Sequence, residues 1–193
     1  DFERLARVTV EICETLDFLH SRGIVLGRFT PSSVVVEERP DRPNGFQIQL
    51  LQLGFELPFH PSANELPDWL HYAAPETLMS RASDRRANLY SLGVVLYELI
   101  TGFRPYDADS PVELMKQHLK LAPTPPRQLR PDLPPDLEAI VLRLLEKRPS
   151  RRFQTAHEVM EAIERRQGRS SARPPRSMRE RGIFSSELIG RQK

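Results

Sequence analysis

Three stretches of the chain repeat apolar residues at helical spacing, and each predicts an amphipathic helix. Residues 2–20, 137–145 and 155–163 place apolar side chains three or four positions apart, and the last begins with a Thr-x-x-Glu capping box. Because an α-helix turns once in about 3.6 residues, this spacing gathers the apolar side chains on one face. We expect each helix to pack that face against a core.

Two further helices are predicted between the first and the last two. Residues 89–100 are apolar nearly all round, which is typical of a helix buried at the centre of a domain, and Gly102 ends the pattern. Residues 110–113, Ser-Pro-Val-Glu, combine a capping box with proline at the first helical position. They predict the start of another helix.

The segment after the first helix has the alternating and β-branched character of strands. Residues 34–36 and 46–51 are short apolar or alternating runs, and residues 41–45 between them carry turn chemistry, Asp-Arg-Pro-Asn-Gly. This arrangement predicts a small antiparallel pair. Residues 55–73 have little periodicity and predict a long loop. The expected fold is therefore mainly α with a small β pair.

Length and composition favour one compact domain. The 193 residues are 39% hydrophobic, which is enough to build a core and argues against wholesale disorder. Cys13 is the single cysteine, so an internal disulfide is excluded, and we expect a reducing compartment, the cytoplasm. We also expect neither a signal segment nor a transmembrane segment, because no apolar run has the required flanks or length.

The net charge of +2 hides an asymmetry between two parts of the chain. Residues 168–193 carry seven Arg or Lys and two Glu, a net charge of +5, which leaves −3 on residues 1–167. We expect residues 1–167 to form the domain and residues 168–193 to be a basic, disordered tail. Because the tail arginines lack interleaved aromatic residues, a solvated linker is favoured, with nucleic-acid or anionic-membrane binding kept as an alternative.

Several motifs occur in an order that is characteristic of one family. Residues 23–36 read Gly-Ile-Val-Leu-Gly-Arg-Phe-Thr-Pro-Ser-Ser-Val-Val-Val, Ala-Pro-Glu follows at 74–76, and residues 89–99 form the apolar helix described above. Arg152 lies near the end, in Pro-Ser-Arg-Arg-Phe. Together they resemble the catalytic loop, the A-P-E motif, the central helix and the late arginine of protein kinases, closest to bacterial serine/threonine kinases of the eukaryotic-like type. The resemblance runs to about Arg166 and implies the C-terminal lobe of the kinase fold.

The resemblance also implies that the reactive positions are degenerate. Phosphoryl transfer needs metal ions and a group that orients the attacking hydroxyl. Arg28 stands where the family has its catalytic aspartate, and a guanidinium cannot accept a proton. Thr30 replaces the loop lysine, and Ser33 replaces the metal-binding asparagine. Gln52 replaces the aspartate of the D-F-G motif, whose glycine is retained as Gly54. We therefore expect no catalytic residue and no metal ligand among them.

Other matched positions concern support and packing. Val35 matches the floor of the adenine pocket, although we expect no nucleotide to be bound. Trp69 replaces the threonine that precedes the A-P-E motif, and Asn88 replaces the central-helix aspartate that receives backbone N–H groups of the catalytic loop. Glu76 and Arg152 match an ion pair that anchors the loop to the last helices. These positions predict that the supporting contacts of the kinase fold are retained, although the residues for phosphate transfer are replaced.

No glycine-rich phosphate loop and no strand lysine precede the first helix, so we expect the N-terminal lobe to be absent from this chain. The expected function is a catalytically inactive kinase-like module, a pseudokinase, that acts as a signalling scaffold without ATP, Mg²⁺ or another cofactor. One alternative is a fragment of a serine/threonine kinase that transfers phosphate from ATP to protein. We expect a partner protein, or the missing lobe, to cover the strand pair at residues 34–36 and 46–51.

Overall fold

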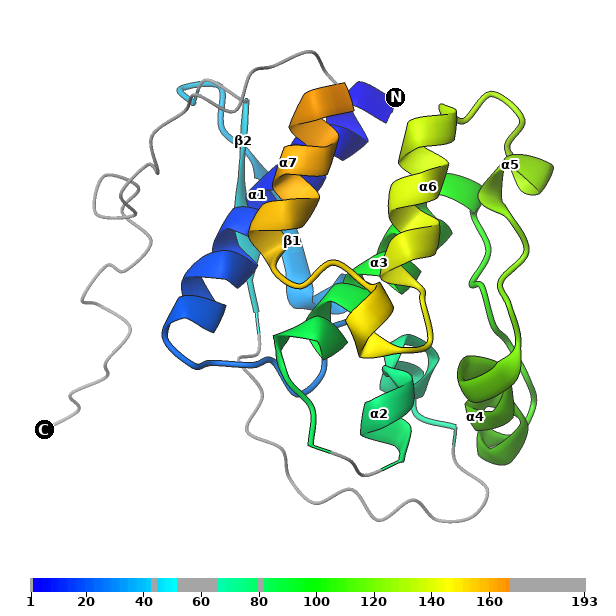
Figure 1. The fold of residues 1–193 in the computed structure, drawn as a ribbon. Helices are drawn as coiled ribbons and strands as arrows, with labels where there is room; N and C mark the ends of the chain where they lie inside the picture. The colour runs from blue at the N-terminus through cyan, green and yellow to red at the C-terminus, as the bar shows by residue number, and fades with distance from the viewer. Residues whose placement is uncertain (1, 43–44, 52–65, 80–81, 167–193) are drawn as a thin grey trace, which may run out of the picture.

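The protein is mostly helical, with a two-stranded antiparallel sheet beside the first helix (Figure 1). The residues that the computed structural model describes are 2–42, 45–51, 66–79 and 82–166. Within them, the longer helices are α1 (Phe2–Ser21), α3 (Arg85–Thr101), α4 (Pro111–Lys120), α6 (Pro135–Leu144) and α7 (Ala156–Arg166). The shorter elements are α2 (Pro75–Leu78), α5 (Pro126–Leu129), 3₁₀ turns at Pro31–Ser33, Asp68–Tyr72 and Pro149–Arg151, and strands β1 (Val34–Glu38) and β2 (Phe46–Leu50).

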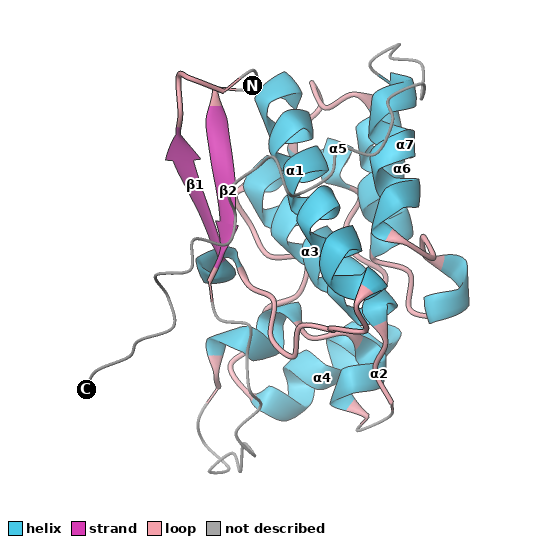
Figure 2. Ribbon diagram, turned by 90° about the vertical axis from the view of Figure 1, so that its left-hand side faces the viewer, coloured by secondary structure: helices cyan, strands magenta, loops and turns pink. Residues whose placement is uncertain are grey.

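Helix α3 runs through the centre of the molecule, between α1 on one side and α6 on the other (Figures 1 and 2). Every residue from Ala87 to Tyr97 is buried, as expected for a helix that is apolar nearly all round. Gly93 permits the close approach of α6, because a Cβ at this position would lie 2.7 Å from the Cβ of Leu144. Gly102 ends the helix at φ 79°, a conformation that glycine adopts without steric cost.

The two strands pair in a register that sorts their side chains between two faces. Val36 lies opposite Ile48, and Val35 lies opposite Gln49. Ile48 and Phe46 are 5% and 4% exposed, so their face belongs to the core. Val35 points to the other face and is 38% exposed. The sheet thus covers α1 with one face and turns the other away from the core (Figure 2).

The outer face of the sheet carries both apolar and polar side chains. Val35 shares the outer face with Glu37, Gln47 and Gln49, because residues two apart on a strand lie on the same face. Among the described residues of the strand pair and its ends, the exposed apolar side chains are Val35 (38%), Val36 (41%) and Leu51 (46%).

Three local features differ from the sequence prediction. Residues 68–72 form a 3₁₀ turn within the stretch that was expected to be loop, and α2 and α5 are four-residue helices that produce no visible periodicity. Helix α3 begins at Arg85, before its apolar run, because the side chain of Asp84 accepts the N–H of Arg86 at 2.8 Å and caps a polar first turn.

Two sequence predictions fall outside the described residues. Gln52 and Gly54 lie in the segment 52–65, and the basic tail occupies residues 168–193. Among the helices that the structure does describe, none combines the length and the apolar character that crossing a membrane requires.

Candidate functional site

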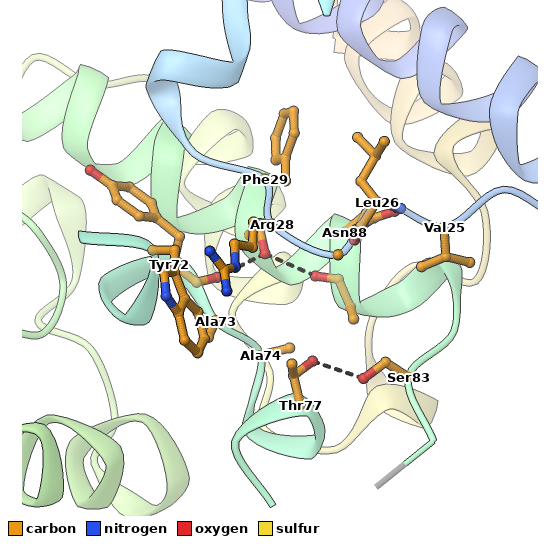
Figure 3. Close-up of a pocket in the computed structure, with 14 residues that line it drawn as sticks. Val25, Leu26, Arg28, Phe29, Tyr72, Ala73, Ala74, Thr77, Ser83 and Asn88 are labelled. Atoms are coloured by element: carbon orange, nitrogen blue, oxygen red, sulfur yellow. Dashed lines mark hydrogen bonds between the residues drawn. The ribbon is translucent and has the colours of Figure 1, made fainter. Parts of the chain in front are cut away.

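A cavity of about 530 Å³ opens between the loop that follows α1, the segment around α2 and the start of α3 (Figure 3). The loop supplies Val25 to Phe29, and α3 supplies Asn88 and Ser91 from its buried face. Thr77 and Ser83 line the cavity with hydroxyl groups that are 2.8 Å apart. The remaining lining residues are Trp69, Tyr72, Ala73, Ala74 and Ala87.

Arg28 brings a positive charge to this cavity. Its guanidinium carbon lies 5.0 Å from the centre of the Trp69 ring, over the face of the indole. The negative face of an aromatic ring attracts a cation in this geometry. Arg28 and Trp69 stand at the positions that the resemblance to kinases assigns to the catalytic aspartate and to the threonine before the A-P-E motif. The two substituted positions are therefore in direct contact.

The hydroxyl groups of Thr30 and Ser33 are used inside their own loop. Both residues are buried, with exposed fractions of 7% and 3%. The Thr30 N–H donates to Ser33 Oγ at 3.2 Å, and the two hydroxyl oxygens are 3.3 Å apart. These contacts close the 3₁₀ turn that leads into β1. Neither hydroxyl forms part of the lining of the cavity that contains Arg28.

Asn88 anchors the loop to the central helix. Its Oδ1 accepts the N–H of Leu26 at 2.9 Å, and its Nδ2 donates to the carbonyl of the same residue at 2.6 Å. The second bond needs an amide, because an aspartate at this position would have no donor. His20 Nε2 lies 3.1 Å from Asn88 Oδ1, and burial lowers the pKa of this histidine. The loop conformation is thus held although the family's aspartate is replaced.

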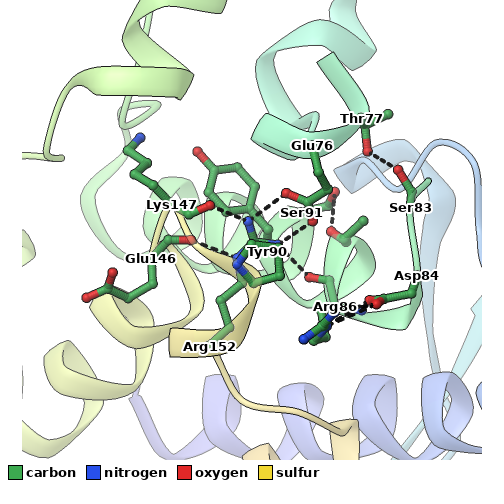
Figure 4. Close-up of polar contacts among 12 residues, drawn as sticks. Glu76, Thr77, Ser83, Asp84, Arg86, Tyr90, Ser91, Glu146, Lys147 and Arg152 are labelled. Atoms are coloured by element: carbon green, nitrogen blue, oxygen red, sulfur yellow. Dashed lines mark hydrogen bonds and ion pairs between the residues drawn. The ribbon is translucent and has the colours of Figure 1, made fainter. Parts of the chain in front are cut away.

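Glu76 and Arg152 form the expected ion pair, in a fully hydrogen-bonded setting (Figure 4). Arg152 is 1% exposed, and its Nη1 and Nη2 donate to the two carboxylate oxygens of Glu76 at 2.7 and 2.8 Å. Its other N–H groups donate to the carbonyls of Arg86, Glu146 and Lys147 at 3.0, 2.7 and 3.1 Å. A guanidinium has five N–H donors, so each one has an acceptor and the charge is tolerated inside the core.

A second buried polar cluster lies beside this pair and was not expected from the sequence. Tyr90 Oη lies 2.9 Å from His118 Nδ1, and Lys147 Nζ donates to Tyr106 Oη at 2.8 Å. Burial, reinforced by the charge of Lys147, lowers the pKa of His118 to about 3. Burial and the charge of Arg152 lower the pKa of Lys147 to about 8. Polar contacts thereby join α4 to α3 through His118 and Tyr90, and join the segment after α6 to Tyr106 through Lys147.

The protein kinase domain family matches residues 2–163, which is most of the chain, and the chain therefore belongs to this family. A protein of Clostridium acetobutylicum named "Probable serine/threonine-protein kinase" is 32% identical over 167 residues, which is 84% of this chain. "Serine/threonine-protein kinase PknB" of Mycolicibacterium smegmatis is 30% identical over 162 residues, 81% of this chain. The matches cover 24% and 25% of these two relatives, so the chain spans about a quarter of their length.

Solved structures show the same fold. The kinase domain of PknI from Mycobacterium tuberculosis superimposes with a TM-score of 0.64 at 24% identity, over 86% of this chain and 56% of that one. The mostly helical architecture with its small antiparallel sheet is thus a protein-kinase-like fold.

Members of this family use a magnesium-bound nucleotide, and the described residues at the matched positions do not fit one. Mg²⁺ takes oxygen ligands and is usually held by carboxylates. Arg28 instead contributes a positive charge, and the Ser33 hydroxyl is buried and engaged with Thr30. No group of three or more His, Cys, Asp or Glu side chains that could hold a metal occurs within the described part of the chain. Val35 lies on the outer face of the sheet, away from this cavity's lining.

The sequence identified Arg28 and Trp69 as two separate substitutions, but it did not predict that the two side chains are in contact. The missed signal was that two positions that touch in the kinase fold are both replaced, one by a cation and the other by an aromatic residue that can bind it. The roles of His20 and His118 were also missed, because isolated histidines carry no spacing pattern.

Proposed function

We propose that this chain corresponds to the C-terminal lobe of a protein kinase that no longer transfers phosphate, and that it acts as a protein-binding module. The observation that carries the proposal is the environment of Arg28. A kinase needs a proton acceptor at this position, whereas Arg28 is a permanent cation that lies over Trp69. The contacts that hold the fold, at Asn88 and Arg152, remain in place. The contacts that support the loop are retained, whereas the residue at the catalytic position is replaced. This combination favours a role in binding another protein.

The outer edge of the sheet is the proposed binding surface. Val35 lies on the outer face of β1 and is 38% exposed, and Leu51, directly after β2, is 46% exposed; Val36, on the opposite face of β1, is 41% exposed at the edge of the sheet. Exposed apolar side chains at the edge of a two-stranded sheet favour an interaction site there. A partner protein, an N-terminal lobe or a second copy of the chain would cover them. Val35→Asp should abolish association and leave helical circular dichroism unchanged, whereas Glu37→Gln on the same face should change neither association nor circular dichroism. A chain that stays monomeric and captures no partner would contradict this surface.

A second candidate function is phosphate transfer from ATP to protein, by a longer protein of which these residues are a part. The names of the relatives, serine/threonine kinases, favour it. Thermal unfolding with and without Mg²⁺-ATP discriminates the two, because a ligand that binds the native state raises the melting temperature. The proposed function predicts no shift. A concentration-dependent shift that requires Mg²⁺ would favour the enzyme.

A further inference from the structure

The outer edge of β1 has no neighbouring strand within the described part of the chain. β2 lies between β1 and α1, so that β1 is the outermost strand (Figure 2). Val36 and Ile48 lie opposite each other on one face, yet Val36 is 41% exposed whereas Ile48 is 5% exposed. Val35, on the other face, is 38% exposed. A third strand beside β1 would cover both valines.

The backbone of β1 directs hydrogen-bonding groups along this edge. The N–H of Leu51 donates to the carbonyl of Ser33 at 2.8 Å, where the two strands begin to pair. Because every second residue of an antiparallel pair bonds its partner strand, Val36 and Glu38 direct their N–H and C=O groups away from β2. An edge of this kind takes up an extended segment of polypeptide by main-chain pairing.

The edge of β1 is apolar at one end and acidic at the other. Residues 34–36 are valines, and Glu37 and Glu38 follow them. The side chain of Glu38 is 79% exposed, and its Oε1 accepts from Arg4 at 3.3 Å. Glu37 Oε2 accepts from Gln49 at 3.4 Å. Since a carboxylate accepts at two oxygens, an incoming strand that is basic at one end and apolar beyond it would match this edge.

Residues 181–185 of the chain, Arg-Gly-Ile-Phe-Ser, have this pattern. They contain no proline, so each residue has an N–H to donate. An antiparallel arrangement matches charge with charge and apolar with apolar side chains on both faces. Its pairs are Arg181 with Glu38, Ile183 with Val36 and Phe184 with Val35.

Other arrangements on this edge lose the match. A shift of two residues in the antiparallel arrangement places Arg181 opposite Val36. A parallel arrangement that keeps the aromatic residue beside its valine places Glu187 opposite Glu38, and like charges directly opposite are destabilising. The β1 strand of a second copy, paired symmetrically about Val36, places Glu38 opposite Val34 and leaves the acidic charge unmatched. The segment 181–185 therefore fits better than a second β1.

The chain after α7 starts close to the acidic end of β1. Arg166, the last residue of α7, donates to Glu3 at 3.0 Å, and the adjacent Arg4 donates to Glu38 at 3.3 Å. The ends of α7 and β1 thus contact neighbouring residues of α1. Residues 167–180 span at most about 50 Å when fully extended, which is more than this separation requires.

We propose that residues 181–185 add to β1 as a third, antiparallel strand and cover the binding surface until a partner displaces them. The inference rests on the proposed function, because it concerns the same surface and adds its regulation. Residues 167–180, rich in Arg, Ser and Pro, are the connection. Main-chain bonds supply the affinity, and the side-chain pairs fix the register.

Disulfide formation in the full chain tests the register. Val35 and Phe184 would form a pair without mutual hydrogen bonds, whose Cα atoms lie about 4.5 Å apart, within disulfide range. Val35→Cys with Phe184→Cys is compared with Val35→Cys with Leu188→Cys, four residues out of register. In a glutathione buffer the first pair should form its disulfide with an equilibrium constant at least about tenfold higher, because an undocked tail gives both pairs similar effective concentrations. Cys13 is buried and does not compete.

A charge exchange tests the ionic pair. Arg181→Glu, added to the first cysteine pair, should lower the equilibrium constant about fivefold, as expected when opposite charges across two strands become like charges. Adding Glu38→Arg should restore it. Arg191→Glu changes the net charge equally outside the segment and should leave the constant within about twofold. Circular dichroism verifies that each variant is folded.

Equal constants for the two cysteine pairs would overturn the inference, and so would a failure of Glu38→Arg to restore the constant. Disulfide-linked dimers at micromolar protein in place of the intrachain disulfide would assign the edge to the tail of a second copy, and would overturn the contact within one chain.

Self-association and partner capture by the same variants separate the inference from the proposed function. If the tail covers the edge, Arg181→Glu should associate more strongly than the wild type, and Val35→Asp should not associate. Association that Val35→Asp abolishes, together with equal disulfide constants, would refute the tail contact alone. A register-specific disulfide without association in any variant, Arg181→Glu included, would refute the proposed binding function alone.

Discussion

The guanidinium of Arg28 lies over the indole of Trp69, with 5.0 Å between the guanidinium carbon and the ring centre. A cation on an aromatic face at a partly exposed site contributes about 0.5–1 kcal/mol, which is too little to hold the fold together. Its consequence is local. The pair fixes a positive charge at the point where a phosphate-transferring enzyme needs a base, and it does so on a loop that Asn88 still anchors.

Trp69 is the single tryptophan of the chain, so its fluorescence reports on this contact. Arg28→Ala should increase quenching of that fluorescence by acrylamide, because the guanidinium covers one face of the indole. The free energy of unfolding should fall by no more than about 1 kcal/mol. Arg28→Lys should give intermediate quenching, since a lysine retains the charge but not the plane.

Arg127→Ala on α5 is the control for that experiment. Unchanged quenching in this variant is expected, because Arg127 lies on α5 and neither contacts the Trp69 ring nor lines its cavity. If Arg28→Ala and wild type were quenched equally, the stacked geometry would be wrong.

The Glu76–Arg152 pair should dominate the stability of the region between α2 and α7. Removing one partner leaves a buried charge and costs roughly 3–5 kcal/mol. Arg152→Ala should cost more than Glu76→Ala, because it also deprives three backbone carbonyls of their donor. Urea unfolding of the two single variants and of the double variant measures these losses.

The double variant should lose less than the sum of the two single losses, as expected for residues in contact. Arg151→Ala removes an exposed neighbouring arginine and should change stability by about 0.5 kcal/mol or less. Strict additivity of the Glu76 and Arg152 losses would mean that the pair does not interact in solution.

His118 should make the protein less stable in acid. Its pKa is about 3 in the folded protein, against an ordinary value of 6.5, so between these values the unfolded chain binds more protons than the folded one. Its contribution is complete above pH 6.5 and is lost as the pH falls toward 3, with a slope of up to about 1.4 kcal/mol per pH unit. His118→Gln removes the titration and should flatten the dependence of unfolding free energy on pH in this window.

Other groups titrate in the same window, so the wild type and the variant must be compared at each pH. His157 is exposed, and His157→Gln provides a histidine control that should leave the wild-type slope intact. Parallel pH profiles for the wild type and His118→Gln would show that the buried imidazole is not the group responsible.

Much of the fold could be predicted because its signals are local. The all-round apolar run of α3, the capping box at Ser110 and the turn chemistry before β2 each specify structure within a few residues. The 3₁₀ turn at Asp68–Tyr72 and helix α2 could not be predicted, because elements of four or five residues contain too few apolar positions for a period. They are held by tertiary contacts, such as the Ser91 hydroxyl that donates to the Tyr72 carbonyl at 2.7 Å.

The residues of the site could be identified from the sequence, but the contacts that they form could not. Motif spacing placed Arg28, Asn88 and Arg152 at named positions of the kinase family. It did not reveal that Asn88 bonds both backbone groups of Leu26, or that Arg152 uses all five of its donors. The contacts of Asn88 with Leu26, and of Arg152 with Glu76 and Arg86, join residues more than sixty positions apart, and only the folded chain brings them together.

An assay of phosphate transfer tests the central claim most directly. That claim is that the chain has the protein-kinase-like fold but does not transfer phosphate. The complete product of the gene that encodes this sequence is incubated with γ-labelled ATP, Mg²⁺ and a generic protein substrate. Loss of a general base alone lowers the rate by about 10²–10⁴-fold, and here the metal-binding positions differ as well. We predict labelling no higher than that of the heat-denatured protein, and no change in Arg28→Ala. Magnesium-dependent labelling that exceeds this control and is lost in Val35→Asp would contradict the account.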